Sequence, residues 1–305
     1  MKVRLFDAHC DTAFELWKRE EGLKDNSCHI SLKNAAGFDS YAQIFAFCSL
    51  AGLKIKHRTE DLLRLPLEKL RQEVSENSDR IAFAVSANEI SALNDQGKIA
   101  ALLSMEGPEL IGCDPERLYD LRTAGFVMTT LTWNADNALA GWHGSEKGLT
   151  ELGKIFVRTA QSLGIYVDVS HLSERSFWDL AEIAEKPIIA SHSNSRKHWN
   201  HSRNLTDDQL RLIAQSGGVV GLNLYVPFLG ESAGFDTLQC HLEHMLHLCG
   251  ENSVCLGGDL DGCDELPDGF QNLSDYNKFY AFLQKKGYPE ELLNNIFYQN
   301  LYRLF

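Results

Sequence analysis

Two potential metal ligands stand two residues apart near the start of the chain. His9 and Asp11 follow a short apolar run at 3–6, in the segment DAHCD. In a strand, residues two apart point to the same side, so an imidazole and a carboxylate would share one face at its C-terminal end. Both groups bind first-row metals. A His-x-Asp pair also occurs often by chance, so a surface histidine beside a surface aspartate is the alternative for this pair alone.

Further histidines and carboxylates close later apolar runs. The whole set is His9, Asp11, Glu106, His171, His192 and Asp259. Three histidines and three carboxylates suit two divalent ions of the zinc type, with one carboxylate bridging them. Each residue alone has an ordinary alternative: a histidine bonded to backbone, a Glu–Arg pair or a helix N-cap. Their joint placement at strand ends favours the metal site.

Eight apolar runs are expected to form strands that position these residues. They are 3–6, 41–49, 99–107, 126–134, 165–171, 187–194, 218–225 and 254–262. Helical periodicity separates most of them, and Thr59, Ser173 and Thr206 are expected N-caps. Because the runs are continuously apolar, they are typical of parallel strands buried on both faces.

This alternation predicts an α/β fold, a (β/α)₈ TIM-type barrel, formed by one catalytic domain over residues 1–305. The structural alternative is a doubly wound open sheet. No GxGxxG or phosphate-loop sequence follows the first run, so nucleotide binding loses its best support. In a parallel barrel all strand C-terminal ends open onto one face, where the six ligands would converge.

The amino-acid composition narrows the classes of binding partner and the compartment to be expected. The chain is 44% hydrophobic and 23% charged, with a formal net charge of −13, which argues against nucleic-acid or acidic-membrane partners. The eight cysteines form no CxxC pair and suggest reduced thiols in a cytoplasmic protein. The N-terminus shows no long apolar signal segment, and no run approaches the roughly 18 apolar residues of a membrane span.

Motifs spread along nearly the whole chain resemble the membrane (renal) dipeptidase family, the M19 peptidases of the amidohydrolase superfamily, in a bacterial-type form. The matching segments are DAHCDT at 7–12, MEG at 105–107, DVSHLSE at 168–174, ASHSNSR at 190–196, SRNLTDDQL at 202–210, GGVVGLN at 217–223 and LGGDLDG at 256–262. The resemblance implies a binuclear zinc barrel, with other divalent metals left open. It assigns His9, Asp11 and Glu106 to one zinc. Glu106, bridging, with His171 and His192 would bind the other.

The resemblance also implies roles for three further residues. Asp259 matches a catalytic aspartate that activates the bridging hydroxide and passes its proton to the leaving amine, which is general base and then general acid catalysis. Arg203 matches an arginine that holds the substrate's C-terminal carboxylate, and a guanidinium pairs bidentately with such a group. Tyr225 matches a residue at the substrate pocket.

One departure from the family pattern concerns the fourth strand run. Renal-type enzymes end it Leu-Thr-His, and that histidine polarises the scissile carbonyl; here Trp133 stands in its place. Tryptophan offers one N–H donor and no charge, and losing an oxyanion donor typically costs about 10²–10³ in rate. The form LTWN resembles a bacterial branch of the family. His143, in the loop GWHG, could supply the donor, although a loop histidine more often faces solvent.

Three functions remain open at this point. The leading one is a zinc-dependent dipeptidase acting on peptides with a free C-terminal carboxylate, including L-Xaa-D-Xaa. The alternative is an amidohydrolase on N-acyl amino acids, lactones or other small amides, because fold does not fix substrate. The third is a non-enzymatic metal-binding protein, which the intact Asp259 speaks against. A homodimer is suggested by resemblance alone, and the side-chain preferences and native metal are left open.

Overall fold

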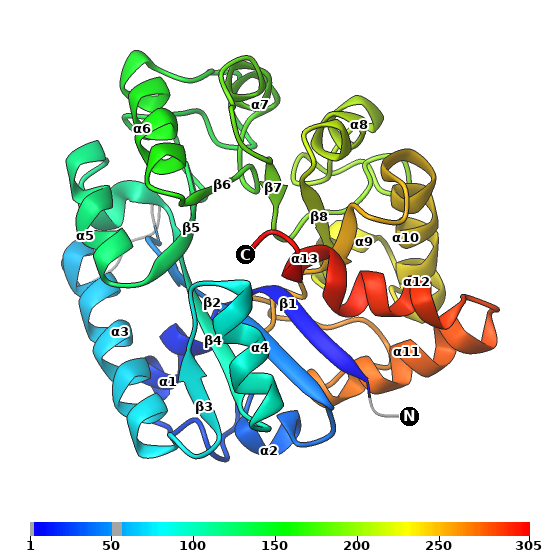
Figure 1. Cartoon of the computed structure of the whole chain (residues 1–305). Coiled ribbons are helices and arrows are strands. Elements are labelled where there is room, and N and C mark those ends of the chain that lie inside the picture. Colours follow the sequence, from blue (N-terminus) through cyan, green and yellow to red (C-terminus); the bar gives the residue numbers. More distant parts are fainter. Residues whose placement is uncertain (1–2, 51–56) are drawn as a thin grey trace.

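The computed structural model describes residues 3–50 and 57–305, and these form a closed barrel of parallel strands surrounded by helices (Figure 1). In order around the barrel, the strands are β1 (Arg4–Cys10), β2 (Ser40–Cys48), β4 (Ile99–Glu106), β5 (Phe126–Thr130), β6 (Tyr166–Asp168), β7 (Ile189–Ala190), β8 (Val219–Leu222) and β9 (Val254–Leu256). Pairing of Asp7 with Leu256 closes the circle between β1 and β9. A further strand, β3 (Ile81–Phe83), pairs with the start of β4. The predicted (β/α)₈ barrel is confirmed.

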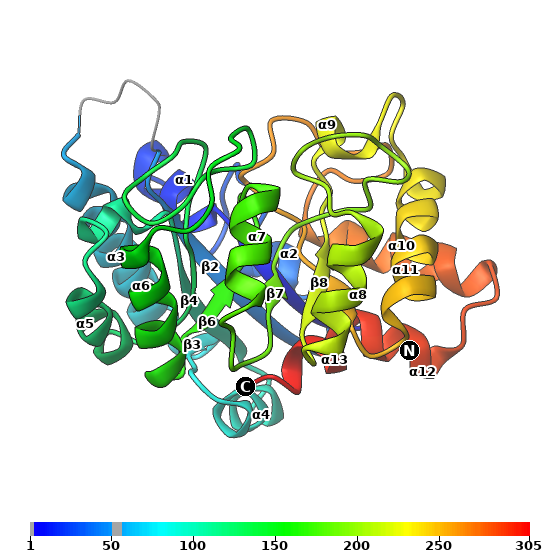
Figure 2. The ribbon, with the colours of Figure 1, turned by 90° about the horizontal axis from the view of Figure 1, so that it is seen from above.

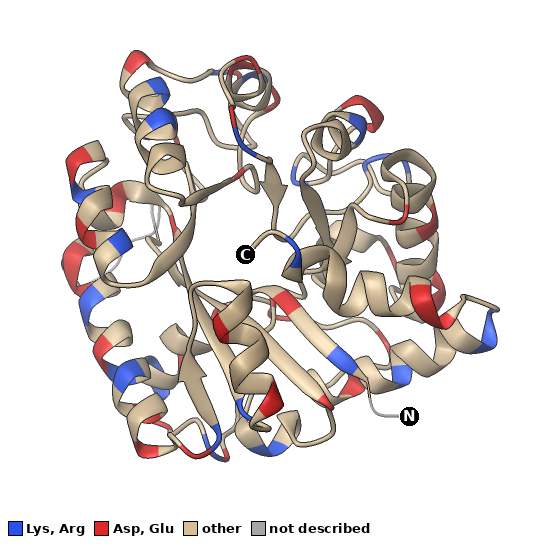
Figure 3. Cartoon of the chain, viewed as in Figure 1, with Lys and Arg blue, Asp and Glu red and all other residues tan. Residues whose placement is uncertain are grey.

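Helices cover the outside of the barrel, and most charged segments lie on them rather than on the strands (Figure 3). They are α1 (Thr12–Arg19), α2 (Leu32–Ala35), α3 (Thr59–Glu76), α4 (Ala87–Asp95), α5 (Leu118–Thr123), α6 (Glu151–Ser162), α7 (Glu174–Ala181), α8 (Asp207–Gln215), α9 (Val226–Leu229), α10 (Phe235–Cys249), α11 (Tyr276–Lys285), α12 (Glu290–Asn294) and α13 (Asn300–Tyr302). No helix within the described ranges has the length and apolarity needed to cross a bilayer.

Helix caps were partly predictable. The side chains of Ser173 and Thr206 accept hydrogen bonds from the backbone N–H groups of Ser176 and Gln209, so both expected caps are confirmed. The expected cap at Thr59 is wrong, because α3 begins at Thr59 itself and Arg58 occupies the cap position without a side-chain bond. Hydroxyl caps satisfy N–H groups that the first helical turn leaves free.

The two ends of the barrel differ. Figure 2 shows α1 and α9, which follow β1 and β8 in the chain, on the upper side, and α4 and α13 on the lower side. The strands therefore point their C-terminal ends upward. At the other end, Phe6 packs against Tyr298 and Phe305, with ring centroids 6.0 and 5.8 Å apart. Apolar side chains thus fill the lower end of the barrel, and the polar side chains described below lie at the upper end.

Two glycines allow a close approach beneath that upper end. A Cβ atom at Gly221 would lie 1.9 Å from the Ser191 carbonyl oxygen, and one at Gly257 would lie 1.7 Å from the same atom. Real side chains do not fit at such distances. The absence of side chains at these positions therefore lets the segment after β7, which carries His192, lie directly against β8 and β9.

Candidate functional site

The six side chains singled out from the sequence lie together at the upper end of the barrel. His9 and Glu106 belong to β1 and β4, whereas the others lie in the segments just after β1, β6, β7 and β9. Their ligand atoms form three overlapping groups, each within 4.8 Å: His9–Asp11–Glu106, Glu106–His171–His192 and His9–His192–Asp259. The first two groups coincide with the ligand sets that the family resemblance implies.

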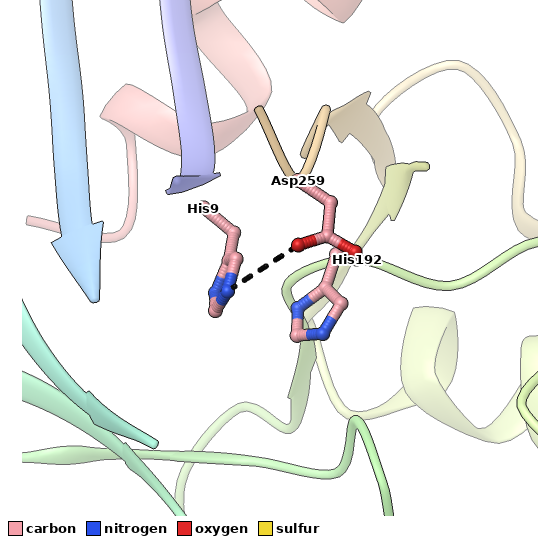
Figure 4. A group of neighbouring side chains, drawn as sticks. All are labelled: His9, His192 and Asp259. Carbon is pink, nitrogen blue, oxygen red and sulfur yellow. Dashed lines mark ion pairs between the residues drawn. The ribbon is translucent and has the colours of Figure 1, made fainter. Parts of the chain in front are cut away.

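Glu106 lies close to all three histidines of the cluster. Its Oε1 atom is 3.7 Å from His9 Nε2, 2.8 Å from His171 Nε2 and 3.5 Å from His192 Nε2. Glu106 is therefore within reach of both groups of candidate ligands that contain it. Figure 4 shows His9, His192 and Asp259 pointing toward one another, and His9 Nε2 is 3.8 Å from Asp259 Oδ1.

Unusual backbone conformations aim two of these side chains into the site. His171 and Asp259 have φ values of 72° and 58°, in the left-handed region that non-glycine residues seldom adopt. The carbonyl oxygen of His171 accepts bonds from the His143 N–H at 2.7 Å and from Thr132 Oγ1 at 3.1 Å. The Asp259 N–H donates to His9 O at 3.2 Å. Strain of this kind is held by such contacts and is common at functional sites.

Buried polar atoms without hydrogen-bond partners show whether a metal ion would fit the cluster. Both ring nitrogens of His9 and Oδ1 of Asp11 are buried and have no hydrogen-bond partner among the described residues. An unsatisfied buried polar group costs about 1–3 kcal/mol, and a cation would satisfy these atoms. Burial lowers the pKa of His9, but the carboxylates of Glu106 and Asp11 outweigh it and raise that pKa to about 10. The cluster therefore attracts positive charge strongly, and its donor set fits divalent cations.

A hydrogen-bond relay orients His192. Its Nδ1 is 2.6 Å from Ser191 Oγ, and the Ser191 hydroxyl also bonds Asp168 Oδ2. An ionised carboxylate only accepts, so the hydroxyl donates to Asp168 and accepts from the Nδ1–H of His192. This arrangement places the ring proton on Nδ1 and leaves Nε2 for a metal. Sequence reasoning did not find Asp168 or Ser191, although both flank ligand motifs.

Replacing Ser191 with alanine is expected to weaken the binding of a divalent metal, with zinc as the probe, about 10–100-fold, which is the usual cost of losing the hydrogen-bond partner of a ligating histidine. Competition with a chelating dye measures this affinity. The matched control is Ser193→Ala, two residues along the same segment, because the Ser193 hydroxyl is buried without a partner in the described part of the chain. Equal zinc affinity in Ser191→Ala and unchanged protein would contradict the relay.

Asp259 is buried beside the metal-ligand cluster and is held in place by Asn223. The Asn223 amide donates to Asp259 Oδ2 at 3.1 Å. Burial raises the pKa of the Asp259 carboxyl to about 6. A carboxyl group with a pKa in this range can both take up and release a proton near neutral pH, as acid–base catalysis requires.

A pocket of about 370 Å³ opens beside the cluster, and its wall includes Arg203, Tyr225, Phe228 and Trp133. Arg203 is only 4% exposed, and its guanidinium lies 5.3 Å from the Phe228 ring centre. Its Nε has no hydrogen-bond partner within the described ranges. A buried guanidinium without a carboxylate partner is suited to binding an anionic group of a ligand.

Trp133 and His143, the two residues considered as donors to the substrate carbonyl, differ in their position relative to the pocket. Trp133 lines the pocket, with its ring centroid 6.4 Å from that of His171. His143 does not belong to the pocket wall, and its Nδ1 is 2.7 Å from Ser202 Oγ. Burial, together with the charge of Arg203, lowers the pKa of His143 to about 3. His244 lies on α10 and bonds Asp207 at 2.8 Å, outside the ligand groups.

Comparison with known sequences gives one family. The sequence model of the membrane dipeptidase family, peptidase family M19, matches residues 1–305. An uncharacterised Klebsiella pneumoniae protein from the 5′ region of pqqA is 31% identical over 258 residues, 80% of this chain and 95% of that protein. An uncharacterised dipeptidase of Schizosaccharomyces pombe is 29% identical over 240 residues, 76% of this chain and 56% of that protein.

Solved structures of metallopeptidases have the same fold as this chain. The crystal structure of dipeptidase AC, an M19 metallopeptidase, superposes with a TM-score of 0.92 at 26% identity, covering 100% of this chain and 98% of that one. A Rhodobacter sphaeroides metallopeptidase liganded with a phosphinate mimic of the dipeptide L-Ala-D-Ala has a TM-score of 0.91 at 26% identity, with 100% and 99% coverage.

Proposed function

The chain belongs to the membrane dipeptidase family, peptidase family M19, and is a metallo-dipeptidase; we propose that it uses two zinc ions to hydrolyse dipeptides with a free C-terminal carboxylate. The observation that carries the proposal is Glu106 Oε1, which lies within 3.7 Å of the Nε2 atoms of three histidines. One carboxylate in reach of two ligand groups is an arrangement suited to a binuclear centre.

The chain's own residues divide into two ligand sets. His9, Asp11 and Glu106 would hold one ion, and Glu106, His171 and His192 the other. When bound, such ions polarise the scissile carbonyl and lower the pKa of a water molecule. The unpartnered atoms of His9 and Asp11 support this assignment.

Arg203 and Asp259 would act on the substrate. Arg203 pairs with the C-terminal carboxylate and so fixes the peptide in the pocket. Asp259 accepts a proton from the attacking water and later donates it to the leaving amine nitrogen. Asn223 orients the Asp259 carboxylate through the 3.1 Å hydrogen bond. Tyr225 and Trp133 contribute to the wall around the substrate.

The substrate class includes dipeptides whose C-terminal residue has the D configuration. The Rhodobacter sphaeroides relative was solved with a mimic of L-Ala-D-Ala, and the two chains share their fold over their whole lengths. The alternative substrates, N-acyl amino acids, lactones and small amides, would use the same metal centre. They differ from dipeptides in lacking a free amino group, an α-carboxylate or both.

The test is a substrate panel on zinc-loaded protein. It contains L-Xaa-L-Xaa and L-Xaa-D-Xaa dipeptides, N-acetyl amino acids and lactones, with zinc counted by mass spectrometry. Two zinc ions per chain are expected, with dipeptide turnover that disappears on chelation and returns with zinc. Turnover of only the acylated substrates or lactones would replace the dipeptidase proposal with the alternative, and a single bound zinc would contradict the binuclear centre.

A further inference from the structure

Asn134 joins the metal-ligand cluster to the substrate pocket. It follows Trp133 in the segment after β5, and its Oδ1 is 3.0 Å from Nδ1 of His171. The same side chain contributes to the pocket wall. Asn134 therefore has one amide atom on a candidate ligand and belongs to the surface that a substrate would touch.

Hydrogen-bond chemistry decides which way the Asn134 amide faces. His171 Nε2 lies 2.8 Å from Glu106 Oε1, on the side of the ring where the metal would bind. The ring proton of a ligating histidine is then on Nδ1, which must donate. The Asn134 atom facing it must therefore be the oxygen. The Nδ2 group, with two donor hydrogens, is the other atom of the amide, and no hydrogen bond joins it to the described residues.

Peptide hydrolysis needs a donor for the carbonyl oxygen, which gains negative charge as water attacks. Three other side chains that carry donors near this wall are already engaged or less suitable. His143 Nδ1 is engaged by Ser202, outside the pocket wall, and Lys18 is engaged by Glu15 at 2.8 Å. Trp133 offers a single N–H on a bulky ring. The Asn134 side chain belongs to the wall, its Oδ1 is fixed by the bond to His171, and its Nδ2 group makes no hydrogen bond to the described residues.

We propose that Asn134 has two roles: its Oδ1 orients His171, and its Nδ2 donates a hydrogen bond to the scissile carbonyl oxygen. The proposal rests on the proposed dipeptidase function and deepens it. Attack of water forms a C–O bond and moves the carbonyl π pair onto oxygen, while Asn134 keeps its proton. When the C–N bond breaks, the π pair re-forms and Asp259 supplies the proton that the amine takes.

Two variants separate the two roles. Asn134→Asp keeps the acceptor facing His171 and removes the donor, whereas Asn134→Ala removes both. The control is Asn252→Asp, the same chemical change at an exposed residue before β9, at the opposite end of the barrel. The readouts are zinc affinity by chelator competition, steady-state dipeptide kinetics and inhibition by a phosphinate analogue of Ala-D-Ala, whose tetrahedral oxygens imitate the transition state.

Asn134→Asp is expected to bind zinc as tightly as the unchanged protein, with similar KM, while kcat and phosphinate affinity fall together by about 10²-fold. Asn134→Ala is expected to lose about 10-fold or more in zinc affinity. At saturating zinc it should show the same loss in kcat, which would exclude repulsion by the added aspartate charge as the cause. Asn252→Asp should match the unchanged protein.

Full kcat and phosphinate affinity in Asn134→Asp would overturn the donor role, and unchanged zinc affinity in Asn134→Ala would overturn the orienting role. Phosphinate binding needs no turnover, so it separates this proposal from the proposed function. An unchanged protein that binds the phosphinate but hydrolyses no dipeptide would refute the function, and a weakened Asn134→Asp complex would still support the donor. An unchanged protein that does neither would reject both.

Discussion

Replacing Asp259 with asparagine is expected to lower kcat for dipeptide hydrolysis by about 10²–10⁴-fold, the usual contribution of a general acid–base group. The amide has the same shape as the carboxyl, and its oxygen can still accept the hydrogen bond from Asn223. It cannot take a proton from water or return one to the amine. KM is expected to change little, because Arg203 rather than Asp259 would bind the substrate. Steady-state kinetics at saturating zinc, with the zinc content of each variant measured, test this expectation.

The matched control for that variant is Asp25→Asn, because Asp25 is an exposed carboxylate that pairs with Lys33 at 2.9 Å and lies outside the candidate site. It should keep the activity of the unchanged protein. A kcat for Asp259→Asn within a few-fold of the unchanged protein, at full zinc occupancy, would show that another group carries the proton. A loss of zinc that accounts for the whole loss of activity would make Asp259 a ligand, in line with its place in the group with His9 and His192.

The strands that could be predicted are those whose apolar runs coincide with hydrogen-bonded backbone. Residues 99–107 were expected as a strand, and β4 spans Ile99–Glu106 with every residue buried. The run at 187–194 is different, because only Ile189–Ala190 form β7, although the Ser193 N–H still bonds the Gly221 carbonyl of β8 at 2.9 Å. Its apolar part is residues 187–190, and the polar residues after them lie beyond the strand. Hydrophobic pattern therefore finds the strands but overestimates the length of the short ones.

The residues of the candidate site could be predicted from the sequence, but the orientations of their side chains could not. The six candidate residues were found because each lies at or just beyond the end of a barrel strand. The left-handed backbone at His171 and Asp259 was not foreseen, since non-glycine residues give no signal for it. That backbone sets which neighbours the His171 ring meets, so the role of Asn134 could not be inferred from spacing. The homodimer and the cytoplasmic location stay predictions.

Replacing Arg203 with alanine is expected to lower kcat/KM for dipeptides by about 10²–10³-fold, because truncating one partner of a buried charge pair costs about 2–5 kcal/mol. Most of the loss should appear in KM, since the guanidinium would hold the substrate and not the reacting atoms. The kcat/KM of Arg203→Lys should lie between those of the unchanged protein and Arg203→Ala, because an ammonium keeps the charge but loses the bidentate geometry. Kinetics on dipeptides and on the matching dipeptide amides measure the effect.

The amides separate substrate binding from a structural role for Arg203. A dipeptide amide has no α-carboxylate, so it should be a poor substrate of the unchanged protein and should lose little further in Arg203→Ala. An equal loss on both substrates would mean that Arg203 supports the site through its bond to His192 O at 3.4 Å and its packing on Phe228. No loss on either would place the carboxylate elsewhere in the pocket. A loss confined to dipeptides requires the buried guanidinium and the substrate carboxylate to meet, because no other difference between the two substrates involves an anion.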